Sequence, residues 1–169
     1  PALTVGVNLS ARQFQHTNLA EEVVEVLRTT GLDPTTLKLE ITESVMMHDV
    51  EATVKIMQQL KYPGIQLIID DFGIGHSSLA YLKRFPVDGL KIDRTFVARL
   101  GHDPRDVAIV RAVIAFADAL SLTATAEGIE SSLQLEQLRA LGCNQGQGYY
   151  FARPLPAEAI VPLFAASPV

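Results

Sequence analysis

The stretch that decides the fold is IQLIIDDFGIGHSSL, residues 65–79. It begins with an apolar run typical of a buried strand and then reaches two adjacent acids, Asp70 and Asp71. Two glycines follow, and glycine permits the tight turn with positive φ that such a strand end needs. A helix is expected next, with Ser77 as its N-cap. Two carboxylates at the end of a strand are better explained by the binding of a divalent cation than by a plain polar turn.

The same unit of strand, turn and helix recurs along the chain. Strand patterns cover residues 3–10, 37–44, 65–70, 89–94 and 122–127, and helical patterns lie between them. This alternation indicates right-handed βαβ units and a parallel sheet. Several strands carry small or polar residues on one face, whereas strands of a doubly wound sheet read as nearly continuous apolar runs. We therefore expect an α/β fold with a TIM-type (β/α) barrel, and keep the doubly wound sheet as the alternative.

Four helix starts carry capping signals, in which a side-chain oxygen can accept from a free backbone N–H of the first turn. They are the Ser10–Gln13 and Ser131–Gln134 capping boxes, Asp49, and Asp103 followed by Pro104. These signals place helices directly after several of the predicted strands or their turns.

Composition limits the function classes. The 169 residues are 48% hydrophobic, which suits one domain, residues 1–169, with a sizeable core. The formal charge of −5, without a basic run, argues against a DNA or RNA partner. No apolar stretch approaches the ~20 residues of a membrane span, and the single cysteine, Cys143, suits a reducing, cytoplasmic location.

Polar residues fall near the ends of five predicted strands, where a barrel places its active groups. They are Asn8, Glu40 with Glu43, Asp70 with Asp71, Lys91 with Asp93, and Glu127 with Glu130. So many carboxylates at one mouth would repel one another without cations. Oxygen ligands suit Mg²⁺, Mn²⁺ or Ca²⁺ rather than zinc or iron. Two ions ~4 Å apart would favour in-line displacement at phosphorus.

Lys91 is the one candidate base in this set. It could orient or deprotonate an attacking water, or neutralise charge, and its structural alternative is a salt bridge with Asp93. An enolase-like barrel that holds Mg²⁺ is a second possibility, and a non-catalytic oligomerisation scaffold is a third. The acidic rim fits both of these less well, because one ion needs fewer acids and a scaffold needs none.

Five motifs, in order from one end of the chain to the other, resemble the EAL domain family of cyclic di-GMP phosphodiesterases. They are NLSARQF from Asn8, LEITES from Leu39, DDFGIGHSSLAYLKRFPVDGLKIDRTFV from Asp70, AEGIE from Ala126, and GCNQGQGYYFARPLP from Gly142. The resemblance implies a TIM-type barrel that hydrolyses cyclic di-GMP to linear pGpG with two Mg²⁺ or Mn²⁺ ions, and inhibition by Ca²⁺.

The resemblance also implies residue roles. Asn8, Glu40, Asp70, Asp71 and Glu127 look like metal ligands, Lys91 like the residue that activates or positions water, and Gln147 like the glutamine that holds an active-site water. Glu127 counts as catalytic too. Asp93 belongs to the lysine's motif, Glu130 is expected to support the loop around Phe72, and Glu43 is a further supporting acid.

Partners follow from the same resemblance. The family implies a homodimer through the loop after Asp71, and attached sensory or diguanylate cyclase domains. A catalytically idle receptor that binds cyclic di-GMP is the rival within the family. Such receptors have lost metal ligands, whereas the acids named above are present in this chain.

Two departures from the family pattern stand out. Ile74 occupies a position that the family usually gives to threonine or another small residue. The Glu-Ala-Leu motif on the family's first strand, whose glutamate is a metal ligand, has no match here. A barrel incomplete at its N-terminus is therefore expected, with open sheet edges and little activity for this polypeptide by itself.

Overall fold

The structure is a computed structural model that describes residues 3–74, 82–101 and 103–166. The strands are β1 (Val5–Leu9), β2 (Leu37–Thr42), β3 (Gln66–Phe72), β4 (Gly89–Ile92), β5 (Thr123–Ala126) and β6 (Gln145–Gly146). The helices are α1 (Ala11–Phe14), α2 (Leu19–Thr30), η1 (Pro34–Thr36), α3 (Glu43–His48), α4 (Val50–Lys61), α6 (Arg94–Val97), α7 (Pro104–Ala119), α8 (Ser132–Ala140) and α9 (Ala157–Ala166).

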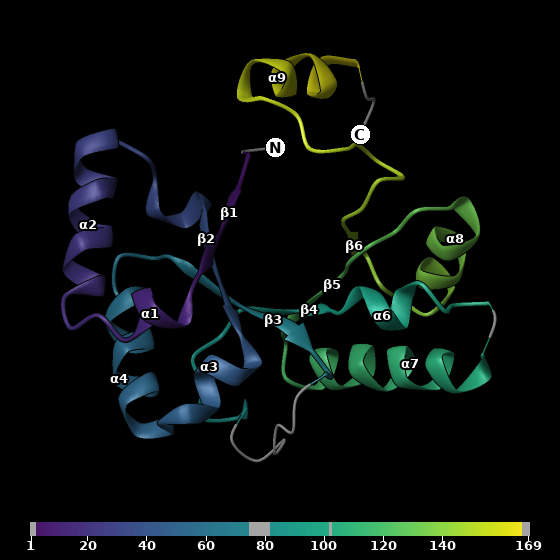
Figure 1. Cartoon of the computed structure of the whole chain (residues 1–169), viewed down its shortest axis with the longest axis horizontal. Coiled ribbons are helices and arrows are strands. Elements are labelled where there is room, and N and C mark those ends of the chain that lie inside the picture. The colour runs from purple at the N-terminus through teal and green to yellow at the C-terminus, as the bar shows by residue number, and fades with distance from the viewer. Residues whose placement is uncertain (1–2, 75–81, 102, 167–169) are drawn as a thin grey trace.

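The six strands form one parallel sheet whose spatial order, β1-β2-β3-β4-β5-β6, is the order in the chain. The sheet is curled, and β1 and β6 form its two edges (Figure 1). Each strand pairs with the strand before it in the sequence, which is the connectivity of a (β/α) barrel and not of a doubly wound sheet. The prediction of an incomplete TIM-type barrel is therefore confirmed.

The outer face of the sheet packs against helices. Alternate residues of β2 are fully or nearly fully buried, among them Leu39 and Ile41, because successive side chains of a strand point to opposite faces. The surrounding helices contribute the remaining side chains of this core. Its best buried side chains include Leu67 and Ile69 of β3, Leu90 and Ile92 of β4, Met57 and Leu60 of α4, and Val110 and Ala117 of α7.

The inner face of the sheet lines a cavity of about 1110 Å³. Its wall is mostly polar where the strands contribute to it, and it continues along the segment from Gln147 to Leu155. The strands and the residue just before β1 contribute Thr4, Gly6, Lys38, Glu40, Gln66, Ile68, Lys91, Thr123 and Thr125 to this wall. The polar inner face expected from the sequence is thus present.

The predicted helix starts are confirmed where the structure describes them. Both capping boxes form with reciprocal bonds, Asp49 caps α4, and Asp103 caps α7 with Pro104 in its first turn. Ser77, the predicted cap of the helix after the two aspartates, lies outside the described residues.

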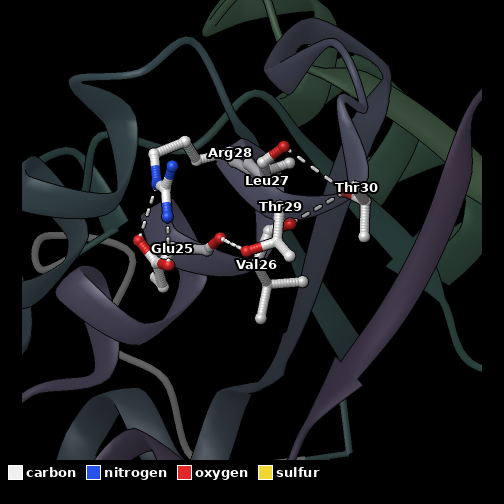
Figure 2. A network of polar contacts seen from close by, with 6 residues as sticks. All are labelled: Glu25, Val26, Leu27, Arg28, Thr29 and Thr30. Atoms are coloured by element: carbon white, nitrogen blue, oxygen red, sulfur yellow. Dashed lines mark hydrogen bonds and ion pairs between the residues drawn. The ribbon is translucent and has the colours of Figure 1, made fainter.

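Helix α2 shows how local sequence ends a helix in this chain. The hydroxyl groups of Thr29 and Thr30 donate to carbonyl oxygens one turn back, and Arg28 forms a two-pronged ion pair with Glu25 (Figure 2). Gly31 then adopts φ 70° and donates its N–H to the carbonyl of Leu27. A left-handed residue at this position is the common helix terminator, and glycine takes it without strain.

Three predicted element ends differ from the structure. Strand β3 continues through both aspartates to Phe72 instead of ending at them. Glu43 begins the short helix α3, where a strand end was expected. Asp93 is the N-cap of helix α6, whereas the pattern suggested that the strand ran to Arg94. Each difference falls at the carboxyl end of a strand, where tertiary contacts override local propensity.

None of the helices in the described part of the chain is both long and apolar enough to span a bilayer.

Candidate active site

The two aspartates owe their positions to an irregularity in β3. Ile69 pairs with Leu90 but Phe72 pairs with Ile92, so three steps along β3 match two steps along β4. One extra residue in a strand is a bulge, and bulges re-aim side chains next to active sites. Asp71 completes the change of direction with φ 54°. The side chains of Asp70 and Asp71, which would otherwise point to opposite faces of the sheet, can therefore both lie at the same rim of the barrel.

Lys91 lies at the centre of the site. Its Nζ is 2.7 Å from Oε2 of Glu40, 2.6 Å from Oε1 of Glu127 and 3.4 Å from Oδ1 of Asp70. These three carboxylates come from β2, the end of β5 and β3, which are separate in sequence. Asp93 is not among the carboxylates within 4.0 Å of Lys91 in the described structure, so the predicted alternative, a Lys91–Asp93 salt bridge, is wrong.

The lysine side chain is only 7% exposed, and its ionisation follows from its neighbours. Burial by itself lowers the pKa of Lys91, but the hydrogen bonds and charges of Glu127, Glu40 and Asp70 outweigh burial and raise the pKa well above the ordinary value. Lys91 is therefore an ammonium ion at neutral pH. An ammonium ion donates hydrogen bonds and neutralises charge, but it cannot accept a proton.

Two acids of the site are harder to ionise than usual. Burial raises the pKa of Glu127, Lys91 opposes this effect, and Asp70 and Glu40 add to it. Burial also raises the pKa of Asp71, and the nearby carboxylates of Asp70 and Asp93 raise it further. One ammonium ion thus does not offset the negative charge gathered here, and a bound cation would.

A divalent ion fits the side chains present. Carboxylate oxygens of Asp70, Asp71 and Glu127 all lie within 4.8 Å of one another. Three such oxygens can surround one hard cation, and this donor set contains no histidine or cysteine. The sequence prediction that separate strands bring their acids together is met at these three positions.

Glu40 and Asn8 belong to the same rim but are placed differently. Glu40 lines the cavity and contacts Lys91, and it is not in the group of three acids. Asn8 lies directly opposite Glu40 in the β1–β2 register. Gly6 of β1 makes room for the Glu40 carboxylate, because a Cβ at Gly6 would come within 2.6 Å of Oε1.

The supporting acids have partners that the sequence did not reveal. A carboxylate oxygen of Glu43, a buried residue, accepts from the N–H of Gly73 at 3.2 Å, just after the two aspartates. Glu130 is exposed, and its own N–H donates to Gln134. In the described structure Glu43 therefore contacts the loop around Phe72, and the support of that loop by Glu130 stays a prediction. In the sequence, the short spacing between Glu40 and Glu43 was the signal that could have placed Glu43 near this loop.

Asp93 is buried and hydrogen-bonded, which its sequence motif did not indicate. It is 5% exposed, and its Oδ1 accepts from both the N–H and the hydroxyl of Thr95. Neither Thr95 nor Gly6 was selected from the sequence. The Asp-x-Thr pattern is a recognisable capping signal, but nothing in it indicates proximity to a metal site.

Gln147 lies beside the end of β5. Its N–H donates to the carbonyl of Ala126 and its carbonyl accepts from the N–H of Ile129, so its backbone flanks the chain on both sides of Glu127. Gln147 lines the cavity, as do Tyr149 and Arg153, whose guanidinium lies 4.9 Å from the centre of the tyrosine ring.

Comparison with known proteins shows which family and relatives this chain resembles. The sequence model of the EAL domain matches residues 1–154. The chain is 48% identical over 157 residues to the bifunctional diguanylate cyclase/cyclic di-GMP phosphodiesterase MucR of Pseudomonas aeruginosa. That alignment covers 93% of this chain and 23% of MucR. The chain therefore spans less than a quarter of the length of this relative.

Solved structures share the fold. A structure of the PaMucR phosphodiesterase in a c-di-GMP complex superimposes with a TM-score of 0.90 at 48% identity, and the match covers 93% of this chain and 64% of that one. Klebsiella pneumoniae BlrP1, in complexes with c-di-GMP and either manganese or calcium, gives a TM-score of 0.83 at 30% identity. The match to BlrP1 covers 89% of this chain and 39% of that one.

Proposed function

Because the chain belongs to the EAL domain family, we propose that it carries a metal-dependent phosphodiesterase site that hydrolyses cyclic di-GMP to linear pGpG. The observation that supports this most is the convergence of Asp70, Asp71 and Glu127 beside an ammonium ion, Lys91, at the carboxyl ends of parallel strands. A barrel places its chemistry at this face. A location in the cytoplasm is part of the proposal.

The metal ligands are Asp70, Asp71 and Glu127, joined by Glu40 and Asn8 from the neighbouring strands. Two Mg²⁺ or Mn²⁺ ions bound by these residues would act as Lewis acids toward the phosphate oxygens and would lower the pKa of bound water. Ca²⁺ takes similar oxygen ligands but accepts looser geometry, and we expect it to inhibit.

The side chains of this chain then have distinct tasks. Lys91 donates to the attacking water or to a phosphate oxygen and balances negative charge, because its raised pKa keeps it protonated. Glu127, whose Oε1 lies 2.6 Å from Nζ of Lys91, is the carboxylate of the set that takes up the proton of the water. Gln147, which follows β6 and lies beside the end of β5, orients the same water.

The atoms balance in a single displacement. The water oxygen forms a bond to phosphorus in line with the P–O3′ bond, which breaks. The 3′ oxygen leaves with the bonding electrons and takes up a proton, and the phosphate stays on the 5′ oxygen of the other guanosine. One water is consumed, and one phosphodiester becomes the 5′-phosphate of linear pGpG.

The test is an assay of cyclic di-GMP turnover by the protein that carries this chain, with product separation by chromatography. Linear pGpG should form with Mn²⁺ or Mg²⁺ and not with Ca²⁺, and Glu127→Gln should abolish it. Glu136→Gln, an exposed glutamate of α8, is the matched control. Binding of cyclic di-GMP without linear product under every metal would instead identify a receptor, and turnover after metal removal would contradict the metal assignment.

Two further parts of the proposal concern partners. A homodimer through the loop after Asp71 is supported only by the family likeness and by Ile74, which is 57% exposed at the start of that loop. The residues that follow lie outside the described structure. Sedimentation of the wild type and of Ile74→Thr tests the dimer.

Attached sensory or diguanylate cyclase domains are proposed because MucR is named as bifunctional.

A further inference from the structure

Thr95 holds a buried carboxylate by one of its two oxygens. The Thr95 N–H lies 2.7 Å and its hydroxyl 2.5 Å from the same atom, Oδ1 of Asp93. Asp93 is 5% exposed, whereas Thr95 is at the surface. Two donors on one oxygen fix the rotation of the Asp93 carboxylate, because a turn about its last side-chain bond would break both bonds.

That carboxylate lies against the metal site. Asp93 follows Ile92, which pairs with Phe72 across β3 and β4, and Asp71 precedes Phe72. Asp71 and Asp93 thus flank the Phe72–Ile92 pair, and the negative charge of Asp93 is near enough to raise the pKa of Asp71. Asp71 stands at a bulged, left-handed position where its backbone direction depends on its neighbours. The orientation of Asp93 therefore bears directly on where the Asp71 carboxylate points.

We propose that Thr95 is a positioning residue of the metal site: its hydroxyl orients Asp93, and Asp93 in turn orients Asp71. Residues that orient metal ligands through one intermediate partner often change metal affinity or activity by ~10- to 100-fold when they are replaced. This inference rests on the proposed metal site but not on the identity of the substrate.

The alternative is that Thr95 only caps helix α6. The chain contains a matched control for that role. Asp33 at the start of η1 accepts from the N–H and the hydroxyl of Thr35 at 2.9 and 2.8 Å, in the same Asp-x-Thr arrangement. Asp33 and Thr35 are exposed, and Asp33 is not one of the acids grouped near Asp70.

The experiment measures Mn²⁺ binding by electron paramagnetic resonance titration in the protein that carries this chain, without nucleotide. Thr95→Val removes the hydroxyl with little change in shape and should weaken Mn²⁺ binding about tenfold. Thr95→Ser keeps the hydroxyl and should bind as the wild type does, and Thr35→Val should also bind as the wild type does. Thr95→Ala replaces Thr95→Val if the latter does not fold.

A double-mutant cycle with Asp71→Asn tests the route. If Thr95 acts through Asp71, Thr95→Val should cause no further loss of Mn²⁺ affinity in the Asp71→Asn background. Unchanged binding in Thr95→Val, equal losses in Thr35→Val, failure of Thr95→Ser to restore binding, or additive losses in the double variant would each overturn the proposal. Because no nucleotide is present, these outcomes stand whether or not cyclic di-GMP is hydrolysed.

Discussion

Gly6 and Glu40 are complementary in size: the carboxylate of Glu40 occupies the space that a side chain at Gly6 would need. A Cβ there would lie 2.6 Å from Oε1 and 3.3 Å from the carboxyl carbon of Glu40. The other oxygen of Glu40, Oε2, accepts from Lys91 at 2.7 Å. A glycine on the neighbouring strand thus helps to determine how the glutamate meets the lysine.

Gly6→Ala should therefore impair activity more than stability. The Glu40 carboxylate must move away from the new methyl group, and a displacement of about 1 Å at a catalytic group can cost ~10²-fold in rate. We expect kcat/KM to fall by roughly ten- to a hundredfold, and the measurement is turnover of cyclic di-GMP beside urea unfolding. Val5→Ala on the same strand is the control, and equal activity of the two variants would contradict the prediction.

Lys91→Met should separate metal binding from turnover. The substitution keeps much of the side-chain volume but removes the cation that contacts Glu40, Asp70 and Glu127. Removing one partner of a buried ion pair typically costs about 3–5 kcal/mol, so the metal-free variant should unfold at a lower temperature. Turnover should fall by at least ~10²-fold.

Mn²⁺ should bind Lys91→Met at least as tightly as it binds the wild type, because the site has become more negative. Calorimetric titration and product chromatography on the same samples measure the two effects. Lys38→Met, at a lysine that lines the same cavity, is the control and should leave both nearly unchanged. Parallel loss of binding and turnover in Lys91→Met would contradict the assignment of Lys91 as a charge-balancing donor.

Asp71→Asn should raise the unfolding temperature of the metal-free protein at neutral pH. Burial and the charges of Asp70 and Asp93 raise the pKa of Asp71 in the folded state, so its ionisation opposes folding. This cost is absent below the unfolded pKa of about 3.9 and is complete above the folded pKa. The advantage of the asparagine variant should accordingly grow as the pH rises from about 4 toward neutrality.

Thermal unfolding of wild type and Asp71→Asn at a series of pH values, in a chelating buffer, measures this difference. Added Mn²⁺ should reverse the order, since a ligand stabilises the form that binds it and the variant lacks one carboxylate. An advantage that shrinks with rising pH would show that Asp71 is not in a destabilising environment.

Asp88→Ala should lower stability without involving the active site. The Asp88 carboxylate accepts from Lys61 at 2.5 Å and from the N–H of Leu67 at 2.7 Å, and Leu67 is fully buried. Loss of the carboxylate leaves that N–H without its partner, which costs ~1–3 kcal/mol. Urea unfolding measures the loss. Glu51→Ala breaks the exposed Glu51–Arg84 pair and should cost less than ~1 kcal/mol.

Much of the fold was predictable because its signals are local. The strand alternation in residues 37–42 predicted which side chains face the helices and which face the cavity. The Ser10 and Ser131 capping boxes predicted two helix starts. Such patterns depend on neighbours within a few residues, so a sequence displays them directly.

Strand ends were harder to predict. Whether β3 stops at Asp70 or passes through Asp71 to Phe72 depends on its pairing with β4, which lies about twenty residues further along the chain. The same holds for Asp93, whose place as the cap of α6 depends on the turn of the chain after β4. Propensity does not decide such boundaries, because cross-strand pairing contributes as much as local preference.

The amino-acid sequence by itself determined the order of strands and helices and indicated a carboxylate-rich site, because periodicity and the carboxylate motifs can be recognised without knowing their neighbours. The tertiary structure decided which acids lie within 4.8 Å of one another, that Lys91 contacts three acids and not Asp93, and which residues Gly6, Glu43 and Thr95 adjoin. The physical reason is that these contacts join residues from different strands and loops, and only the curvature and register of the folded sheet bring those residues within a few ångströms of one another.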